Sequence, residues 1–280
     1  MKKILAILAF ALPLIMTSCL QDKMYEGPSS IDELTLDPAA PTSIQEVTVT
    51  VKTSGLQAIT SAVLTYNDGG KPVQMTGSGN QWTGKIPPLP DKTKVTVTVV
   101  VTNSAGFTTS KTAEYTVGNP PVDYKKLVIN ELDASEADDA DKFLEFYNNG
   151  DFEISMKDIT IIKNDADEVW KGIEGEVCPA HGYFVIQGVK DKSGRGINAG
   201  VSPKKSVKLE VFAPDGKTSI DKIQHGDCDE SGAWDQSVKI TPKAGISWSR
   251  VPNGTGKYMM AEATNGKVNA TSGEEDPEVK

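Results

Sequence analysis

Two cysteine–histidine pairs are the residues of this chain whose types and spacing could do chemistry. Cys178 precedes His181 by three positions, His225 precedes Cys228 by three, and each pair encloses a turn-forming residue. Because tight turns can aim both side chains of a pair at one point, the four could bind Zn²⁺ tetrahedrally in a structural site. In an exported protein the competing interpretation is a disulfide between Cys178 and Cys228, which we favour. Unlinked side chains are the third possibility.

A second candidate is the acidic loop between residues 133 and 141. Its carboxylates belong to Asp133, Glu136, Asp138, Asp139 and Asp141. Clustered carboxylates are the ligands that Ca²⁺ prefers, but the spacing is not that of an EF-hand and the central glycine is missing. A solvated acidic loop is therefore favoured over a calcium site.

The third candidate is a long segment from Gly226 to Lys243. It holds an aromatic ring flanked by carboxylates and an amide: Trp234 with Asp229, Glu230, Asp235 and Gln236. An apolar ring face with nearby polar groups can hold a sugar, and loops on a rigid scaffold often carry function. The alternative, which we favour, is that Trp234 folds back to plug its own loop.

Catalytic motifs do not appear in this sequence. We find no nucleophile elbow, phosphate-binding loop or metalloprotease helix motif. A Ser-His-Asp arrangement would need His181 or His225, and both have simpler interpretations above. The sequence therefore predicts a protein that is not an enzyme.

The first 19 residues have the three zones of a secretory signal. Lys2 and Lys3 are followed by an apolar run from Ile4 to Met16, which is too short to span a hydrocarbon core. The stretch LIMTSC, ending at Cys19, resembles the lipobox of bacterial lipoproteins, although Met16 stands where Leu is commoner. The resemblance implies cleavage before Cys19 and acyl chains such as palmitate on it. Two or more acyl chains anchor a protein durably to a membrane.

Leu20 follows this cysteine, where the lipoprotein resemblance makes Asp the usual signal for inner-membrane retention. We therefore expect an outer-membrane lipid anchor, with the chain periplasmic or surface-exposed. Loss of the two signal lysines takes the formal net charge of −9 to about −11 in the mature chain. Such a charge argues against non-specific binding of nucleic acid or anionic lipid.

The first half of the mature chain reads as short strands. Val47, Val49 and Val51 alternate with polar residues, which is typical of a half-buried strand. Further strands are predicted at 62–66, 81–86, 95–102 and 112–117, separated by Gly- and Asn-rich turns at 67–70, 77–80 and 104–106. Regular short strands favour a β-sandwich. The run from YNDGG through QWTGKIP to VTNSAG resembles bacterial immunoglobulin-like modules, which implies a spacer, with Trp82 and Tyr66 in its core.

Domain boundaries follow from composition. We expect a signal peptide at 1–18, a lipidated tether at 19–30, the spacer at 31–118 and a linker at 119–125 containing Pro120 and Pro121, which stiffen the junction. A second domain is predicted at 126–269. The tail at 270–280 is acidic without apolar anchors, so it is predicted to be disordered.

The second domain has an order of motifs that resembles the lamin tail domain. These motifs are LVINEL from 127, FLEFYNNG from 143, GYFVI from 182, a hairpin around Pro214-Asp215-Gly216, SWSRVPNG from 247 and TNGKVN from 264. The resemblance implies an immunoglobulin-like β-sandwich. Asn265 stands where the family usually has Pro, and the segment between Gln224 and Ser247 is unusually long. Glu131 and Glu145 are expected to serve strand pairing or turn bonding, and Arg250 to pack against an aromatic ring.

The predicted fold class is therefore all-β, with two immunoglobulin-like sandwiches in series after the signal and tether. We expect a non-catalytic, lipid-anchored envelope protein for adhesion or scaffolding, whose C-terminal domain binds a protein or envelope component. Alternatives are a glycan-binding lipoprotein of a nutrient-uptake system and an accessory to an exported hydrolase. No cofactor is expected beyond the possible structural Zn²⁺ or Ca²⁺. Folds of this class host unrelated functions, so the ligand stays open.

Overall fold

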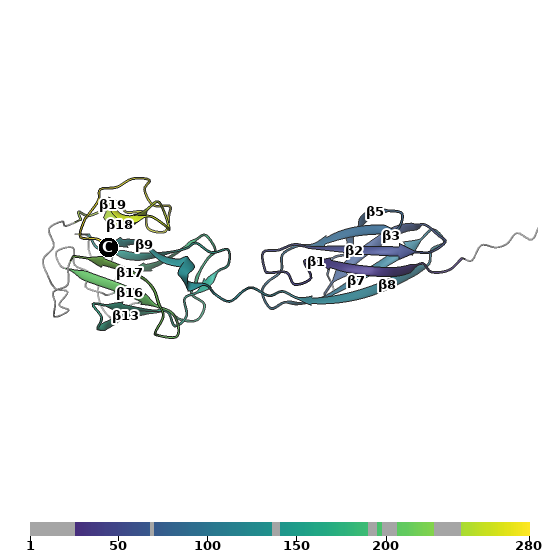
Figure 1. Ribbon diagram of the computed structural model, residues 1–280, viewed down its shortest axis with the longest axis horizontal. Helices are drawn as coiled ribbons and strands as arrows, with labels where there is room; N and C mark the ends of the chain where they lie inside the picture. The colour runs from purple at the N-terminus through teal and green to yellow at the C-terminus, as the bar shows by residue number, and fades with distance from the viewer. Residues whose placement is uncertain (1–25, 68–69, 136–140, 190–194, 198–205, 227–241) are drawn as a thin grey trace, which may run out of the picture. The chain divides into compact units, whose positions relative to one another are not determined.

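The computed structural model describes residues 26–67, 70–135, 141–189, 195–197, 206–226 and 242–280. Over these ranges the chain is all-β, built from antiparallel sheets, with a single 3₁₀ turn, η1 (Tyr124–Lys126). No helix of these residues is long and apolar enough to cross a bilayer. The chain divides into two compact units, 1–120 and 121–280, and the boundary between them along the sequence falls between Pro120 and Pro121 (Figure 1).

Unit 1 is a sandwich of two four-stranded antiparallel sheets. One sheet has the order β1-β2-β6-β5, with β1 (Ser30–Asp37), β2 (Val47–Ser54), β6 (Gln81–Ile86) and β5 (Thr76–Ser78). The other has the order β4-β3-β7-β8, with β4 (Val73–Gln74), β3 (Ile59–Tyr66), β7 (Lys94–Asn103) and β8 (Thr108–Thr116).

The alternation of apolar residues explains this sandwich. Val47, Val49 and Val51 of β2 are at most 1% exposed, and their polar neighbours face outward. The valines of β7 repeat the pattern from the other sheet, and Trp82 joins the same buried cluster. The strands therefore form where period-2 patterning predicts them. In β1 the alternation is interrupted by a register shift between Ile31 and Glu33, after which Leu34 and Leu36 pack against the same cluster and the strand pairs with β2.

Unit 2 contains three antiparallel sheets. The five-stranded sheet has the order β15-β10-β9-β18-β19, with β15 (Tyr183–Gln187), β10 (Phe143–Asn148), β9 (Leu127–Asp133), β18 (Ile246–Val251) and β19 (Lys257–Glu262). The four-stranded sheet has the order β13-β12-β16-β17, with β13 (Asp167–Lys171), β12 (Thr160–Lys163), β16 (Val207–Phe212) and β17 (Ser219–His225). β11 (Ile154–Ser155) pairs with β14 (Val177–Cys178).

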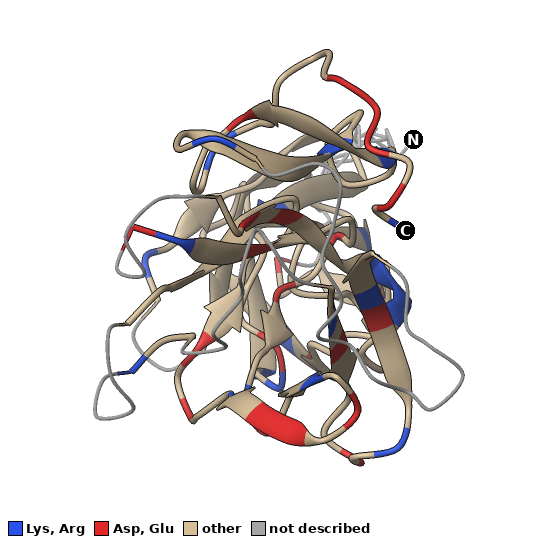
Figure 2. Ribbon diagram, turned by 90° about the vertical axis from the view of Figure 1, so that its left-hand side faces the viewer, with Lys and Arg blue, Asp and Glu red and all other residues tan. Residues whose placement is uncertain are grey.

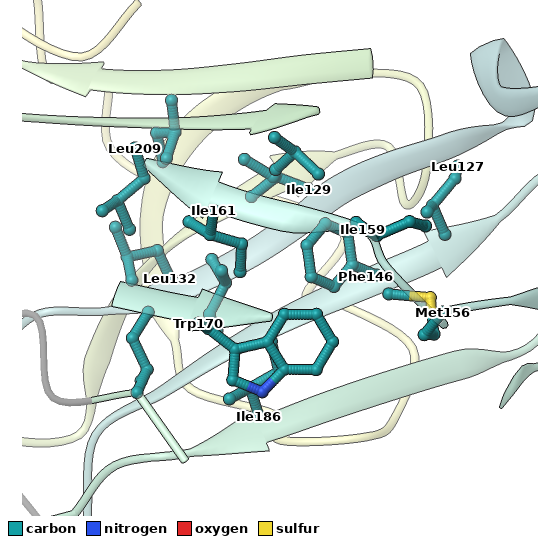
Figure 3. Packing of buried hydrophobic residues seen from close by; sticks show 14 of the residues in the cluster. Leu127, Ile129, Leu132, Phe146, Met156, Ile159, Ile161, Trp170, Ile186 and Leu209 are labelled. Carbon is teal, nitrogen blue, oxygen red and sulfur yellow. The ribbon is translucent and has the colours of Figure 1, made fainter. Parts of the chain in front are cut away.

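The core of unit 2 lies between the five- and four-stranded sheets. Leu132 and Phe146 come from the first sheet, and Ile161, Trp170 and Leu209 come from the second, all in one buried cluster (Figure 3). Each of these side chains is at most 5% exposed. Burial of large apolar groups from both sheets is the main force that holds the layers together.

The hairpin between β16 and β17 forms at the predicted Pro-Asp-Gly turn. Asp215 accepts hydrogen bonds from the backbone N–H groups of Lys217 and Thr218, both at 2.8 Å, and from the Thr218 hydroxyl at 2.6 Å. These bonds favour the ionised form and lower the pKa of Asp215 to about 2. Gly216 has a φ of +65°, which glycine adopts without strain.

The prediction that residues 270–280 are disordered is wrong. Lys280 exchanges two backbone hydrogen bonds with Gln224, and Glu274 exchanges two with Met260. Asp276 is only 2% exposed, and Figure 2 shows the acidic residues of this segment in red close to the C-terminus. The tail adds backbone partners to the free edge of β17, and its one apolar residue near the end, Val279, packs against the core of unit 2.

Candidate functional site

Several residues singled out in the sequence lie outside the described part of the chain. They are Cys19, Glu136, Asp138, Asp139, Cys228, Asp229, Glu230, Trp234, Asp235 and Gln236. The anchor, most of the acidic loop and the whole aromatic candidate site are therefore among the predictions that stay predictions.

Cys178 is a free cysteine, fully buried in the core of unit 2. Its thiol lies 3.5 Å from the carbonyl oxygen of Gly182, to which it donates. Burial is the main cause that raises the pKa of this thiol to about 12, so the reactive thiolate is suppressed. Cys178 is a free thiol in this structure and Cys228 lies outside the described residues, so the favoured disulfide between them stays a prediction.

The two histidines occupy unrelated environments. His181 sits in an exposed turn with a φ of +48°, and its Nε2 lies 2.9 Å from Asp151 Oδ1. His225 is fully buried at the end of β17, with Nε2 3.1 Å from Asp276 Oδ2 and its ring 4.0 Å from that of Trp248. Burial lowers the pKa of His225, and the Asp276 carboxylate partly opposes this.

These placements do not bring the three described members of the possible zinc set together. Within the described ranges, no three His, Cys, Asp or Glu side chains form a group able to hold a metal ion. Cys178 points inward from β14 whereas His181, three residues later, faces solvent. The spacing of the pairs therefore does not aim both members of the first pair at one point.

A buried polar network is the most elaborate arrangement in unit 2. It consists of Asn130, Glu131, Glu145, Ser247, Ser249, Asn253, Thr264 and Asn269, and we call it the closing-turn network. Strand register assembles it, because Glu131 of β9 lies opposite Glu145 of β10 on one side and opposite Ser249 of β18 on the other. Both glutamates are fully buried.

Glu131 binds the turn that follows β19. Its Oε1 accepts hydrogen bonds from the Thr264 N–H at 2.8 Å and from the Ser247 hydroxyl at 2.5 Å. Its Oε2 accepts from the Thr264 hydroxyl at 2.6 Å and from the Asn265 N–H at 3.3 Å. Four donors around one buried carboxylate fix the turn against the sheet.

Glu145 binds the same turn at the next residue along the chain, Gly266. It accepts hydrogen bonds from the Asn130 side chain at 2.6 Å and from the backbone N–H of Gly266. Burial, with a smaller contribution from the negative charge of Glu131, raises the pKa of Glu145 to about 7, and its two hydrogen bonds limit the rise. The carboxyl therefore keeps its proton to a higher pH than an exposed glutamate does.

Asn269 completes the network from the far end of the turn. Its side-chain N–H groups donate to the carbonyl oxygens of Asn130 at 3.1 Å and Arg250 at 3.0 Å. The network therefore uses its polar atoms to fasten residues 264–269, as expected for Glu131 and Glu145. A site whose polar atoms hold one another stabilises a fold and offers no open position to a substrate.

Arg250 has the structural role that the sequence predicts. Its guanidinium lies 4.5 Å from the centroid of the Tyr258 ring and pairs with Asp221 at 2.8 Å. It also donates to the carbonyl oxygens of Ile129 at 2.7 Å and Gly256 at 3.1 Å. These bonds join β9, β17 and the β18–β19 hairpin.

The closing-turn network predicts a pH-dependent stability of unit 2. Because the pKa of Glu145 is raised from 4.5 to about 7, the folded state binds this proton more tightly than the unfolded chain. The resulting stabilisation is fully present below about pH 4.5 and is lost as the pH rises through about 7. We expect Glu145→Gln, which stays neutral, to gain stability relative to the natural chain as the pH rises across this window, measured as urea midpoints.

The comparison at each pH cancels the opposite contribution of His225. The pKa of His225 is lowered by burial, so its contribution to stability is lost as the pH falls. Glu168→Gln, at an exposed position of β13, is the matched control and should follow the natural chain at every pH. A constant difference between Glu145→Gln and the natural chain from pH 4.5 to 8 would contradict the prediction.

Two open grooves of unit 2 could receive a ligand. One, of about 560 Å³, lies on the four-stranded sheet and is lined by Phe212, Ile162, Thr160, Asp158 and Glu168, among others. The other, of about 580 Å³, lies between the C-terminal tail and the β18–β19 hairpin. The first groove was not predicted from the sequence, although the partly exposed apolar residues Ile162 and Phe212 interrupt the polar face of alternating strands.

Comparisons with known proteins leave the family open. No family model matches. No curated protein matches either. Similar solved structures include the cycloalternan-forming enzyme of Listeria monocytogenes in complex with a pentasaccharide substrate, at 14% identity and a TM-score of 0.25, which covers 78% of this chain and 20% of that one. A cycloalternan-degrading enzyme of Trueperella pyogenes in complex with cycloalternan has 14% identity and a TM-score of 0.26, covering 75% and 33%. This chain thus spans a third or less of their lengths, and at these TM-scores the likeness carries no argument about function.

Proposed function

We propose that this chain is a non-catalytic, lipid-anchored protein of the outer membrane, whose C-terminal domain binds a protein or another envelope component. The observation that carries the proposal is that the potentially reactive side chains of unit 2 are buried in its core or bonded to other groups of the same domain. Glu131 and Glu145 fasten the closing turn, Cys178 is a buried thiol, and His225 is buried against Asp276. Groups occupied in this way stabilise the domain, which leaves its surface to act.

The order of segments supports an anchored binding protein. The signal-like start and Cys19 come first, followed by a sandwich suited to the role of spacer. The resemblance of unit 2 to lamin tail domains fits a module that presents a surface at the end of such a spacer.

Glycan capture is the second candidate function, and the groove on the four-stranded sheet favours it. Phe212 and Ile162 contribute apolar surface to its lining, while Asp158, Glu168 and Thr160 contribute oxygen atoms. A sugar can stack its apolar face on such a surface and bond its hydroxyl groups to the oxygen atoms. The predicted site at Trp234 would be an additional or separate contact.

The anchor is tested with Cys19→Ser in the full chain. We expect this variant to appear in the soluble fraction, or to remain an uncut precursor, because it lacks the acyl chains that hold it to the bilayer. Cell fractionation and mass spectrometry of the processed protein measure both results. A processed Cys19→Ser protein that still fractionates with membranes would overturn the anchor.

The ligand class is tested with the same full chain. A pull-down on intact cells and a glycan array are run on the natural chain, on Phe212→Ser and on Thr112→Ser, an exposed control in unit 1. Protein capture unaffected by Phe212→Ser supports the leading function, whereas glycan binding lost in Phe212→Ser supports the second. Glycosidase or nuclease activity of the purified chain would overturn the non-catalytic proposal.

A further inference from the structure

One end of unit 1 combines the entry of the chain with exposed apolar side chains. The segment Gly27–Ser29 enters there, beside the loops 54–58, 79–80 and 104–107, and we call these four segments the entry end. Two hydrogen bonds place the entering segment against the end of β7 and the start of β8. The Asn103 side chain donates to Gly27 O at 2.8 Å, and the Thr109 hydroxyl donates to Ser29 O.

Two large apolar side chains are exposed at the entry end. Leu56 is 70% exposed and Phe107 is 42% exposed. Their loops lie side by side, because the backbone N–H of Ser104 donates to the carbonyl oxygen of Ala58 at 2.8 Å. Single exposed apolar residues are ordinary on protein surfaces. Two such residues, Leu56 and Phe107, on adjoining loops at the point where the chain enters the domain are less ordinary.

The Phe107 loop is held in place from within. The buried Asn103 side chain accepts hydrogen bonds from the N–H groups of Ala105 at 3.1 Å and Phe107 at 3.0 Å. The same side chain binds Gly27, so one buried residue fixes both the entering segment and the backbone of the turn that carries Phe107. A ring held outward in a rigid turn loses little conformational entropy when it binds an apolar phase.

Charge is distributed unequally between the two ends of unit 1. The loops 54–58, 79–80 and 104–107 contain no charged residue, and the nearest charges on the entering chain are the exposed Glu26 and Asp32, whose carboxylate accepts a hydrogen bond from the Ser54 hydroxyl at 2.9 Å. The loops of the opposite end, at 38–46, 67–72 and 87–93, carry Glu46, Asp68, Lys71, Asp91 and Lys92. Uncharged loops can approach lipid without the desolvation cost of buried ions.

The chain before Gly27 brings this end close to the predicted anchor. Eight residue steps separate Cys19 from Gly27, which span at most about 28 Å when fully extended. A tether this short gives the loops a high effective concentration at the surface that holds the lipid, so even a weak contact is populated.

We infer that the entry end of unit 1 rests on the bilayer, with Leu56 and Phe107 inserted among the lipid headgroups and upper acyl chains. This contact rests on the proposed lipid anchor and adds a second attachment point to it. Its occupant is the lipid surface itself, recognised through apolar contact rather than charge, in keeping with the acidic mature chain. The contact would orient unit 1 on the membrane.

The test uses Phe107→Trp and Leu56→Trp in the full acylated chain, with Ile44→Trp at the opposite end as the matched control. Ile44 is 54% exposed, so all three rings start in water. Each protein is reconstituted into vesicles of phosphatidylethanolamine and phosphatidylglycerol, with and without brominated acyl chains. We expect brominated lipid to quench the added emission at positions 56 and 107 and to leave that at position 44 unchanged.

Equal quenching at all three positions, or none at 56 and 107, overturns the contact. Mass spectrometry of the same samples separates this from failure of the anchor: an unmodified Cys19 overturns the anchor and the contact together, whereas an acylated chain without quenching overturns the contact alone. As a second measurement, Leu56→Ser with Phe107→Ser in the Cys19→Ser chain should bind vesicles about tenfold more weakly than Cys19→Ser alone. Unchanged vesicle binding counts against the contact.

Discussion

Glu131→Gln is expected to lower the free energy of unfolding of unit 2 by about 2–4 kcal/mol, because it breaks the bonding of the closing turn. Each carboxylate oxygen accepts from one backbone N–H, that of Thr264 or that of Asn265. Whichever way the new amide turns, its NH₂ group faces one of these N–H donors. Two donors that face each other in a buried site leave a polar group unsatisfied.

Urea unfolding of the full chain, followed by tryptophan fluorescence, measures this loss. Trp170 and Trp248 report on unit 2 and Trp82 on unit 1, so the two transitions are compared separately. Glu174→Gln is the matched control in the same unit. Its pair with Lys157, at 2.6 Å, is exposed, so its loss should leave the urea midpoint nearly unchanged. Equal effects of the two substitutions would show that the closing turn does not depend on Glu131.

Deletion of residues 274–280 is expected to cost unit 2 about 3–5 kcal/mol. It removes five backbone hydrogen bonds, with Gln224, Gly226 and Met260, each worth about 1 kcal/mol. It also uncovers His225, which is buried against Asp276 and the ring of Trp248. A change in Trp248 fluorescence should accompany the loss in urea midpoint.

Asp276→Ala separates the side chain from the backbone in this segment. This substitution should lower the free energy of unfolding by about 1–3 kcal/mol, which is part of the loss expected for the deletion, because it leaves the buried His225 Nε2 without its acceptor. The exposed neighbour provides the control: Glu275→Ala breaks only a 3.7 Å pair with Lys257 and should leave the midpoint nearly unchanged. A deletion with the stability of the natural chain would show that the tail does not contribute to the fold.

Local patterning accounts for most of the strands. Val47, Val49 and Val51 alternate in the sequence and are buried in β2, and the Pro-Asp-Gly turn at 214–216 joins β16 to β17. These features depend on neighbours in sequence, so periodicity and turn chemistry are sufficient to predict them. β1 was not predicted because the register shift between Ile31 and Glu33 interrupts its alternation and leaves only Leu34 and Leu36 in phase.

The role of a polar residue could be predicted from the sequence only where it depends on contact with one other residue. Arg250 packs on an aromatic ring as expected, but the ring is Tyr258, its cross-strand partner. The order of the tail was not predictable from its acidic composition, because its partners Gln224 and Met260 come from β17 and β19. Nor does the spacing of Cys178 and His181 reveal that one faces the core and the other solvent.

The sequence by itself determined the all-β class, the junction at Pro120-Pro121 and the turn positions, because short-range periodicity and backbone preference are encoded locally. Only the tertiary structure decided which polar groups share a site. Glu131 and Thr264 are 133 positions apart, and they meet because β9 lies beside β18 and the chain turns back after β19. Burial then sets the pKa of Glu145 and of Cys178, since desolvation depends on every element that covers a group rather than on its neighbours in sequence.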